Sequence, residues 1–203
     1  MKLRNIRNYS SALLLAMMSL MACDPDTIDL TPIGNTEGEY FQNEAQMEEA
    51  VMGVYQKLAF FYAFRGGQNN NLAPVWHLPS DDLTTTANYS QENFSGLNGG
   101  NGQLSLFYDY SYQLISRANT VLQKIEENGD FAYKKQPELK NHHKGEALFL
   151  RAHIYFLLWN VYGTAPLVSK RITQLANAYP ENSKGTDLLD QAIVDLNEAA
   201  TLL

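Results

Sequence analysis

The strongest hydrophobic pattern of the chain runs from residue 145 to residue 162. One set of apolar side chains follows helical spacing and a second set lies beside it: Ala147, Leu150, Ile154, Leu157, Leu158 and Val161, then Leu148, Ala152, Tyr155, Trp159 and Tyr162. Because the two sets cover most of the circumference, we expect a helix that other elements enclose. It should begin near Glu138 and end at Gly163, which can adopt a left-handed conformation, shortly before Pro166.

Three further segments show helical spacing on one face each. The first begins near Asn43, which can form a capping box with Gln46. The second spans residues 104–128 with Gly129 as its stop, and the last follows Thr186 as its N-cap. These patterns predict an all-α chain. The three apolar faces are Met47, Ala50, Val51, Val54 and Leu58; Tyr110, Leu114, Ala118, Val121 and Ile125; and Leu189, Ala192, Ile193, Leu196, Ala199, Ala200 and Leu203.

The last helix carries a pattern of small residues that is typical of a tetratricopeptide repeat. Ala192, Leu196 and Ala199 match the second helix of such a repeat, in which small residues allow two helices to approach closely. The helix at 145–162 would be its partner. The connection at 169–185 is longer than a standard repeat allows, so the spacing alone does not define one.

Between the first two helices, residues 65–103 have no helical period and interleave aromatic side chains with Asn, Gly and Thr. Loops of this length tend to carry function. Sugar sites commonly combine an aromatic platform with Asn, Asp and Arg side chains that bind the hydroxyls. Alternatively, Trp76 anchors the loop on the core and the asparagines are turn residues. The candidates for glycan binding are Arg65, Asn69, Asn70, Asn71, Trp76, Asp81, Asp82, Tyr89 and Asn93.

The start of the chain has the features of an export signal. Lys2, Arg4 and Arg7 precede an apolar run that is too short to span a bilayer. Residues 20–23, Leu-Met-Ala-Cys, resemble a bacterial lipobox, in which Cys23 is lipidated and anchors the mature chain to a membrane. We therefore expect residues 1–22 to be a signal peptide and residues 23–42 to be an acidic tether. The alternative is an ordinary signal peptide with a chance cysteine.

The charge balance is acidic. The formal net charge is −7, from 15 basic and 22 acidic residues. Three of the basic residues precede Cys23, so the mature chain would keep 12 basic against 22 acidic residues, a net charge of −10. Such a surface repels phosphates, which argues against nucleic acid as a partner.

Catalytic and metal motifs are missing from the sequence. No G-x-S-x-G, P-loop, H-E-x-x-H or G-x-G-x-x-G pattern occurs, and adjacent histidines such as His142 and His143 do not face one metal. We read that pair as hydrated residues at a helix start and Asp81-Asp82 as a cap or turn. We therefore expect neither an enzyme nor a cofactor or metal site.

Two polar residues lie on the enclosed helix. His153 should be a hydrogen-bonded core histidine. Arg151 needs a carboxylate partner if it is buried, because an unpaired buried charge is costly, and Asp195 or Glu198 of the last helix could provide it.

Several segments together resemble the SusD-like (RagB/SusD) family. They are Glu146 with Phe149-Leu150-Arg151-Ala152 and Tyr155-Phe156, Tyr162-Gly163 with Ala165-Pro166-Leu167-Val168, Arg117-Ala118-Asn119, Cys23-Asp24 with Asp29-Leu30-x-Pro32, and Asp195-Leu196-x-x-Ala199. The resemblance implies a fold of tetratricopeptide-like helix pairs without catalytic activity. It further implies an outer-membrane lipoprotein, facing the cell exterior, that binds glycan beside a TonB-dependent SusC-like transporter, with the 65–103 loop contributing to the ligand site.

The resemblance also implies that residues 43–203 are the N-terminal part of a longer helical domain, incomplete at the C-terminus. The last helix is still in period at Leu203, so Leu203 and Ala199 would need another element to cover them. Two other functions remain open. The same helices and anchor suit a lipoprotein that binds a protein partner and no sugar, and a lipoprotein glycan hydrolase is the third possibility.

Overall fold

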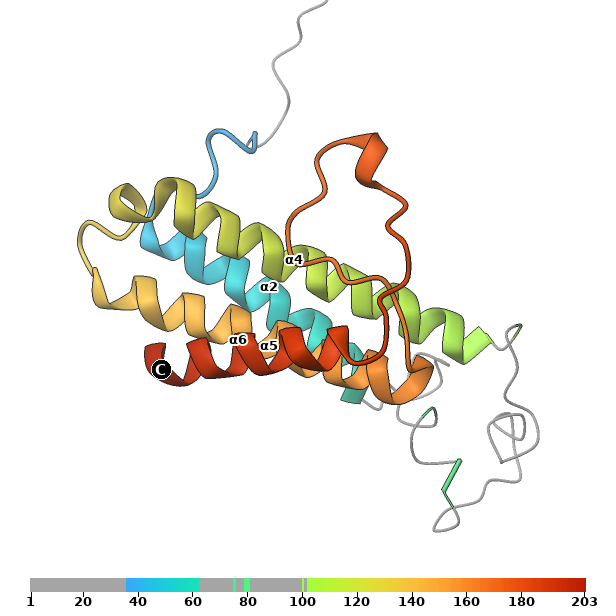
Figure 1. Cartoon of the computed structure of the whole chain (residues 1–203). Coiled ribbons are helices and arrows are strands. Elements are labelled where there is room, and N and C mark those ends of the chain that lie inside the picture. Colours follow the sequence, from blue (N-terminus) through green and yellow to red (C-terminus); the bar gives the residue numbers. More distant parts are fainter. Residues whose placement is uncertain (1–35, 63–74, 76–78, 81–99, 101) are drawn as a thin grey trace, which may run out of the picture. The chain divides into compact units, whose positions relative to one another are not determined.

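The computed structural model describes residues 36–62, 75, 79–80, 100 and 102–203 (Figure 1). The chain divides into two units, Met1–Glu39 and Tyr40–Leu203, and the described helices lie in the second. The regular elements of its described residues are helices, as predicted, apart from one isolated antiparallel bridge between Pro166 and Asn182. The described helices are α2 (Glu44–Tyr62), α4 (Gly102–Ala132), α5 (Glu138–Tyr162), the short 3-10 helix η2 (Leu175–Asn177) and α6 (Asp187–Leu202).

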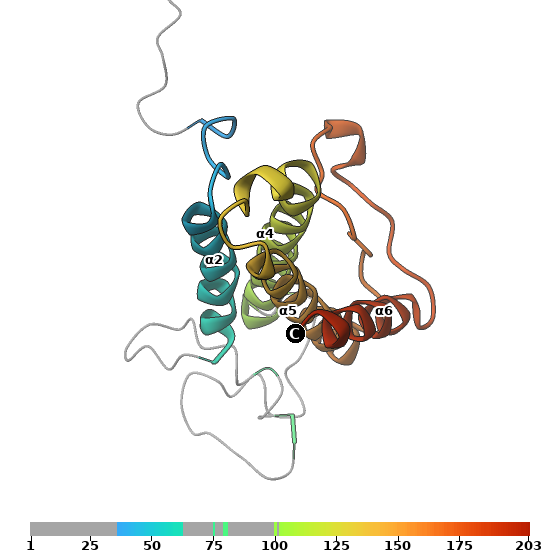
Figure 2. The same cartoon turned by 90° about the vertical axis from the view of Figure 1, so that its left-hand side faces the viewer.

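Helix α5 is the central helix of this unit. It packs against α2, α4 and α6, and the view along the bundle places it between α6 and the α2/α4 pair (Figure 2). Most of the side chains in its two predicted apolar sets are buried. A strip of the helix stays open, since Phe149 and Phe156 are 46% and 48% exposed. The expectation of an enclosed helix is therefore confirmed, except along this strip.

The pair formed by α5 and α6 has the close approach expected of a tetratricopeptide-like repeat. The two helices run antiparallel (Figure 1), and Ala192 and Ala199 of α6 are both buried. A Cβ added to Gly145 of α5 would lie 2.9 Å from Cγ of Leu203, so the helix backbones are close at this end. Small residues thus allow the approach on both helices.

The predicted ends of α2 and α5 are confirmed with changes in detail. Oδ1 of Asn43 accepts the Gln46 N–H at 3.1 Å, which is the N-cap bond. The side chain of Gln46 accepts the Gln42 N–H at 2.8 Å instead of that of Asn43, so the capping box is shifted by one residue. At the end of α5, Gly163 has φ +70° and ψ −53°, and Thr164 N–H bonds the Tyr162 carbonyl at 2.8 Å. This is a γ-turn, which glycine tolerates.

Gly129 does not end α4, contrary to the sequence prediction. The helix continues to Ala132, and Gly129 is a buried helical residue whose carbonyl accepts the Tyr133 N–H at 3.0 Å. The side chain of Lys140 crosses it, with Cε 2.7 Å from where a Cβ would be. The glycine leaves room for this lysine, which is paired with Asp130 at 2.7 Å.

Helix α6 also differs from the prediction. Thr186 is the N-cap but makes no side-chain cap bond, and its hydroxyl bonds Oδ2 of Asp190 at 3.0 Å. The buried face is turned by about one residue from the predicted one, because Asp195 points inward to Arg151 of α5. The residues of the buried face are Leu188, Ala192, Asp195 and Ala199, and the exposed ones include Ile193, Val194, Leu196 and Leu203. The side chain of Leu203 is exposed to solvent, as predicted, whereas Ala199 is buried against α5.

The connection between α5 and α6 is a closed loop that stands out from the helices (Figure 1). Its two arms meet at the Pro166–Asn182 bridge, where the Ser183 N–H donates to the Ala165 carbonyl at 3.1 Å. The first arm then runs along α4, and η2 lies farther out. The loop is therefore held at its base by its own backbone.

Candidate functional site

The residues that the sequence predicts for glycan binding fall outside the described part of the chain. This holds for Arg65, Asn69, Asn70, Asn71, Trp76, Asp81, Asp82, Tyr89 and Asn93, and for the lipidation candidate Cys23. Their roles stay predictions. Val75, next to Trp76, is described and is buried in the hydrophobic core.

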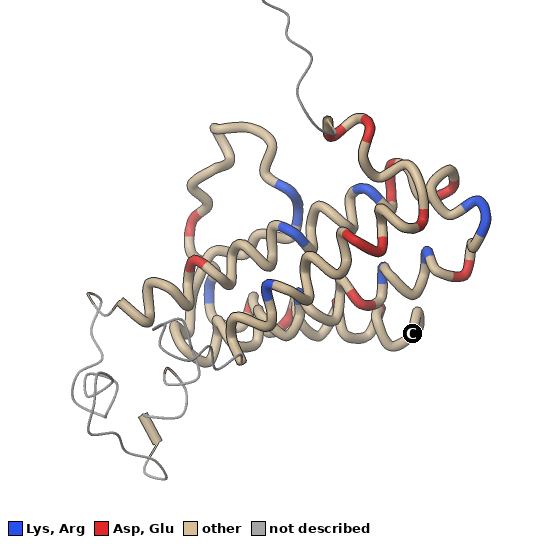
Figure 3. The backbone as a smooth tube through the Cα atoms, turned by 180° about the vertical axis from the view of Figure 1, so that it is seen from behind, with Lys and Arg blue, Asp and Glu red and all other residues tan. Residues whose placement is uncertain are grey.

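The described residues form a cavity of about 370 Å³ between α4 and the α5–α6 connection. We call it the tyrosine cavity, because Tyr108 and Tyr112 of α4 and Tyr179 of the connection all line it. Basic positions lie where the connection meets the helices (Figure 3), and two of them, Lys170 and Arg171, line the cavity. The remaining lining residues are Ser116, Asn119, Pro166, Val168, Ile172, Ala178 and Pro180.

The floor of the tyrosine cavity is fixed by two hydrogen bonds from α4 to the connection. The Tyr112 hydroxyl donates to the Pro166 carbonyl at 2.7 Å, and Nδ2 of Asn119 donates to the Val168 carbonyl at 2.7 Å. Burial raises the pKa of Tyr112 well above its ordinary value, so its hydroxyl stays a neutral donor. The ring centroids of Tyr108 and Tyr112 lie 4.6 Å apart, so the two rings form one aromatic surface.

A buried polar network behind this floor joins α4, α5 and α6. Arg151 of α5 binds Asp195 of α6 through two bonds, from Nε to Oδ2 and from Nη2 to Oδ1, each 2.7 Å long. Its Nη1 donates to Oδ1 of Asn119 at 2.6 Å and to the Ser169 carbonyl at 2.9 Å. The predicted ion pair of Arg151 is confirmed, with Asp195 as the partner. Glu198, the other candidate, pairs with Lys144.

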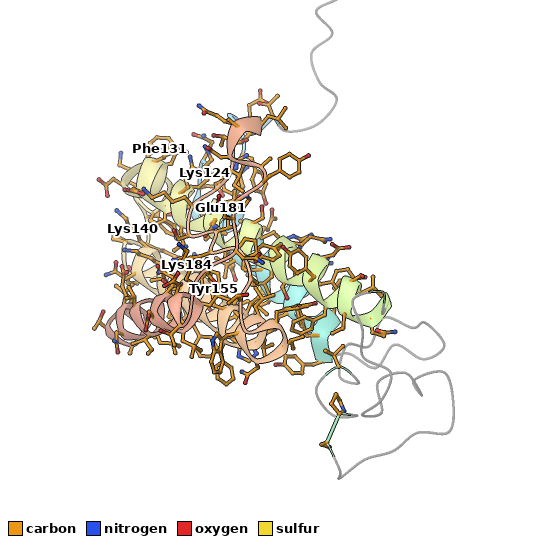
Figure 4. The ribbon with its side chains drawn as sticks, turned by 45° about the vertical axis from the view of Figure 1, so that its right-hand side comes forward. Lys124, Phe131, Lys140, Tyr155, Glu181 and Lys184 are labelled. Carbon is orange, nitrogen blue, oxygen red and sulfur yellow. The ribbon has the colours of Figure 1, made fainter. Side chains whose placement is uncertain are left out.

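The same network holds the first arm of the connection. Tyr155, labelled in Figure 4, points from α5 to the connection and donates its hydroxyl to the Val168 carbonyl at 2.8 Å. Burial would lower the pKa of Arg151, but the bond and the charge of Asp195 outweigh it and the pKa is raised. The guanidinium is thus a permanent cation whose donors bind a carboxylate, an amide and a carbonyl at once.

Two shallower hollows continue the tyrosine cavity along α4, on the other side of Tyr108. One includes Asp109 and Arg117, and the other reaches Tyr162 at the end of α5. The Tyr108 and Tyr162 rings meet edge to face, 5.7 Å apart at 87°. Burial raises the pKa of Tyr162 to about 12, and its hydroxyl donates to the Leu104 carbonyl at 2.6 Å. Tyr108 therefore lies between the tyrosine cavity and a hollow that contains both an acidic and a basic residue, Asp109 and Arg117.

Two of the described histidines, His143 and His153, make hydrogen-bond contacts with tyrosines. His143 was predicted to be hydrated, but it is buried, and the Tyr133 hydroxyl lies 2.9 Å from its Nδ1. His142 stays exposed, 3.4 Å from Glu146. His153 is half-buried and lies 2.7 Å from the Tyr62 hydroxyl, which confirms its hydrogen bond but not a core position. Among the described residues, no group of three or more His, Cys, Asp or Glu side chains could hold a metal.

Residues 35–203 match a family profile of SusD-like proteins described as starch-binding and associating with the outer membrane. The chain therefore belongs to the SusD-like family. Members of this family are binding proteins without catalytic activity, in agreement with the expectation drawn from the motifs. Within the part of the chain that the structure describes, no helix is both long and apolar enough to cross a membrane.

Individual relatives agree with this assignment. A SusD-like protein of Bacteroides ovatus is 24% identical over 199 residues, which are 94% of this chain and 34% of that protein. A SusD superfamily protein of Bacteroides vulgatus matches with a TM-score of 0.66 and 23% identity over 81% of this chain and 35% of its own. A structure solved with a xylogluco-oligosaccharide matches with a TM-score of 0.62 and 23% identity, over 79% of this chain and 30% of its own. The structural matches show the fold, and the chain spans about a third of each relative.

Sequence reasoning missed the tyrosine cavity. The run Tyr108, Tyr110 and Tyr112 was visible, but it lies within a helix, and only Tyr110 entered the predicted apolar face. The other wall comes from residues 170–180, which carry no periodic signal. The signal that could have identified the site is an aromatic residue every second position on a helix, because such spacing cannot bury all of them on one face.

Proposed function

We propose that the chain is the N-terminal part of a cell-surface lipoprotein that captures oligosaccharide or polysaccharide for a TonB-dependent, SusC-like outer-membrane transporter. The observation that carries the proposal is the match of residues 35–203 to a family described as starch-binding and associating with the outer membrane. The match to a structure solved with a xylogluco-oligosaccharide supports a saccharide as the ligand.

The tyrosine cavity has the features that a sugar site needs. Tyr108 and Tyr112 offer an aromatic surface for the apolar face of a pyranose, and the bond of Tyr112 to Pro166 fixes its orientation before a ligand arrives. We propose that the 65–103 loop supplies further contacts through the residues predicted from the sequence. Specificity would depend on both parts.

Calorimetric titration of the whole chain, in detergent, against a panel of neutral and acidic oligosaccharides tests glycan binding. We expect at least one oligosaccharide to bind, and Tyr108→Ala to weaken it by about tenfold, because an aromatic platform contributes on the order of 1 kcal/mol or more. Tyr179→Ala probes the opposite wall. If no oligosaccharide binds to the wild-type chain, the proposal is wrong.

Anchoring is tested separately. We expect Cys23→Ala to abolish incorporation of labelled palmitate and to release the chain from the outer membrane, since an acyl chain is the proposed anchor. Protease treatment of intact cells should degrade the anchored wild-type chain if it faces the exterior. Retention of the Cys23→Ala variant in the membrane would contradict a lipid anchor.

A protein-binding function without sugar is the alternative. It is favoured by the exposed apolar residues of α6, in particular Ile193 and Val194, which are 56% and 57% exposed. Co-purification of a TonB-dependent transporter with this chain, combined with no glycan binding in the panel, would select it.

A further inference from the structure

We infer that the tyrosine cavity binds an aromatic substituent of a glycan, an aryl or hydroxycinnamoyl ester group, whose ring enters the cavity while the sugar lies at its rim. The inference rests on the proposed glycan binding and specifies the class of glycan. Two features of the cavity lead to it: the distribution of polar groups between its buried base and its exposed rim, and the aromatic character of its walls.

The polar groups at the base of the cavity are already engaged in bonds within the chain. The Tyr112 hydroxyl donates to a carbonyl of the connection at 2.7 Å. Nδ2 of Asn119 donates to the Val168 carbonyl at 2.7 Å, and Oδ1 of the same amide accepts Nη1 of Arg151 at 2.6 Å. The Val168 carbonyl accepts the Tyr155 hydroxyl as well, at 2.8 Å. A sugar hydroxyl placed at the base would lose its bonds to water and gain few in exchange, which is unfavourable.

The hydroxyl groups of the rim differ from those of the base, because their residues reach solvent. They belong to Tyr108, Ser116 and Tyr179, which line the cavity and are exposed. A hydroxyl both donates and accepts, so these groups can exchange bonds with water for bonds with the hydroxyls of a sugar. The cavity therefore joins an apolar base to a polar rim, and this order matches a sugar that carries an apolar group.

Charge offers little selection in this cavity. Arg171 already has an interaction partner within the chain, and Lys170, exposed at the rim, is the other basic residue among the described lining residues. Selection must therefore come from shape and from contact with the rings of the walls.

The walls favour an aromatic ring over a methyl or acetyl group. The ring centroids of Tyr108 and Tyr112 lie 4.6 Å apart and the ring planes differ by 45°, so a third ring can stack on one and meet the other with its edge. Such aromatic pairs add to the stabilisation that comes from burying apolar area. The volume of about 370 Å³ lies in the range of small-molecule sites and exceeds what a methyl or acetyl group can fill.

Matched glycosides that differ only in their substituent test the inference. The whole chain, in detergent, is titrated by NMR with phenyl, cyclohexyl and methyl β-glycosides of glucose, galactose and xylose, and with an arabinoxylan trisaccharide with and without a feruloyl ester. In at least one series we expect the aryl form to bind about tenfold more tightly than the methyl or unesterified form, and the phenyl form more tightly than the cyclohexyl form. A preference below about threefold in every series, or equal binding of the phenyl and cyclohexyl forms, overturns the inference.

Two tryptophan substitutions locate the ring. Ala178 lines the cavity from the exposed connection and has helical φ −72° and ψ −15°, which a larger residue can adopt. Ala178→Trp should fill the cavity and reduce the preference for the aryl form to below about threefold. Phe131→Trp, at a residue of α4 that is 65% exposed and does not line the cavity, is the matched control and should leave the preference unchanged.

Retention of the full preference in Ala178→Trp would overturn the inference, because the ring would then bind outside the cavity. Circular dichroism shows whether each variant is folded, and Ala178→Leu takes the place of an Ala178→Trp variant that is not.

The outcomes separate this inference from the proposed function. Binding of unsubstituted oligosaccharides without any preference for aryl forms overturns the aromatic ligand and leaves glycan binding intact. Absence of binding to every carbohydrate, substituted or not, overturns both.

Discussion

Arg151 shows how one buried charge organises this unit. Its side chain meets Asp195, Asn119 and the Ser169 carbonyl, each from a different element. The ion pair could be predicted from the sequence, because a cation on an enclosed helix needs a carboxylate and Asp195 lies on the adjoining helix. The bond to Asn119 could not, since it depends on the orientation of α4 against α5.

Breaking this pair should be costly. We expect Asp195→Asn to lower the free energy of unfolding by about 3–5 kcal/mol, because it leaves the Arg151 cation buried without a counter-charge. Urea denaturation measures the change. Arg151→Met/Asp195→Leu removes both charges and should recover most of the loss. A cost below about 1 kcal/mol for Asp195→Asn would contradict the role given to the pair.

His143, which is buried, and His153, which is half-buried, predict a dependence of stability on pH. Burial lowers the pKa of His143 and of His153 below the ordinary value of 6.5, so the unfolded chain binds protons at a pH where the folded chain does not. Stability is therefore full above about pH 6.5 and is lost as the pH falls below it. Urea denaturation between pH 7.5 and 5.5 should show this fall, and His143→Gln/His153→Gln should flatten it. An unchanged slope in the double variant would contradict the assignment.

The elements differ in how far the sequence determined them. The existence of α2, α4, α5 and α6 followed from hydrophobic spacing, and the start of α2 and the end of α5 followed from the caps at Asn43 and Gly163. The face of α6 did not. Leu188 and Leu189 head two neighbouring apolar stripes, and the choice between them is made by Asp195, which must point to Arg151. A tertiary contact thus decided what spacing left open.

The orientation of α6 can be measured by two truncations. Leu188→Ala should lower the free energy of unfolding by about 2–5 kcal/mol, because the side chain is fully buried. Ile193→Ala, at a residue of the predicted face that is 56% exposed, should cost less than about 1 kcal/mol. Equal costs in urea denaturation, or a larger cost for Ile193→Ala, would mean that α6 is turned the other way.

Gly129 offers a second test at the scale of the helix. It lies inside α4 with helical geometry, so Gly129→Ala should raise the free energy of unfolding by up to about 1 kcal/mol. The nearest atoms to the new methyl group belong to the flexible end of Lys140, which can move. Gly129→Ala/Lys140→Ala is the control and should show the same gain relative to Lys140→Ala. A loss of stability in Gly129→Ala alone would mean that Lys140 is held in place.

At the scale of the whole unit, three helices and the first arm of the connection are joined by one set of polar bonds. The Val168 carbonyl accepts from Asn119 of α4 and from Tyr155 of α5, and Arg151 binds the next carbonyl, that of Ser169. The helices could be predicted from the sequence, but this set of bonds, which we call the carbonyl clamp, could not. The first arm has no hydrophobic period, and the pattern of side chains does not indicate which backbone carbonyls accept hydrogen bonds. The wall of the tyrosine cavity depends on the carbonyl clamp.

We expect Tyr155→Phe to loosen that wall, although Tyr155 does not line the cavity. The variant loses one hydrogen bond to Val168, at a cost of about 1 kcal/mol, and the amides of residues 167–171 should exchange hydrogen faster. Tyr55→Phe is a matched control, since it loses a comparable bond from α2 to Glu146 of α5, 3.0 Å long, away from the connection. It should cost a similar free energy in urea denaturation and leave exchange at 167–171 unchanged. If both variants accelerate exchange at residues 167–171 equally, the Tyr155 bond does not act on this segment in particular, and the cavity wall depends on the stability of the whole bundle.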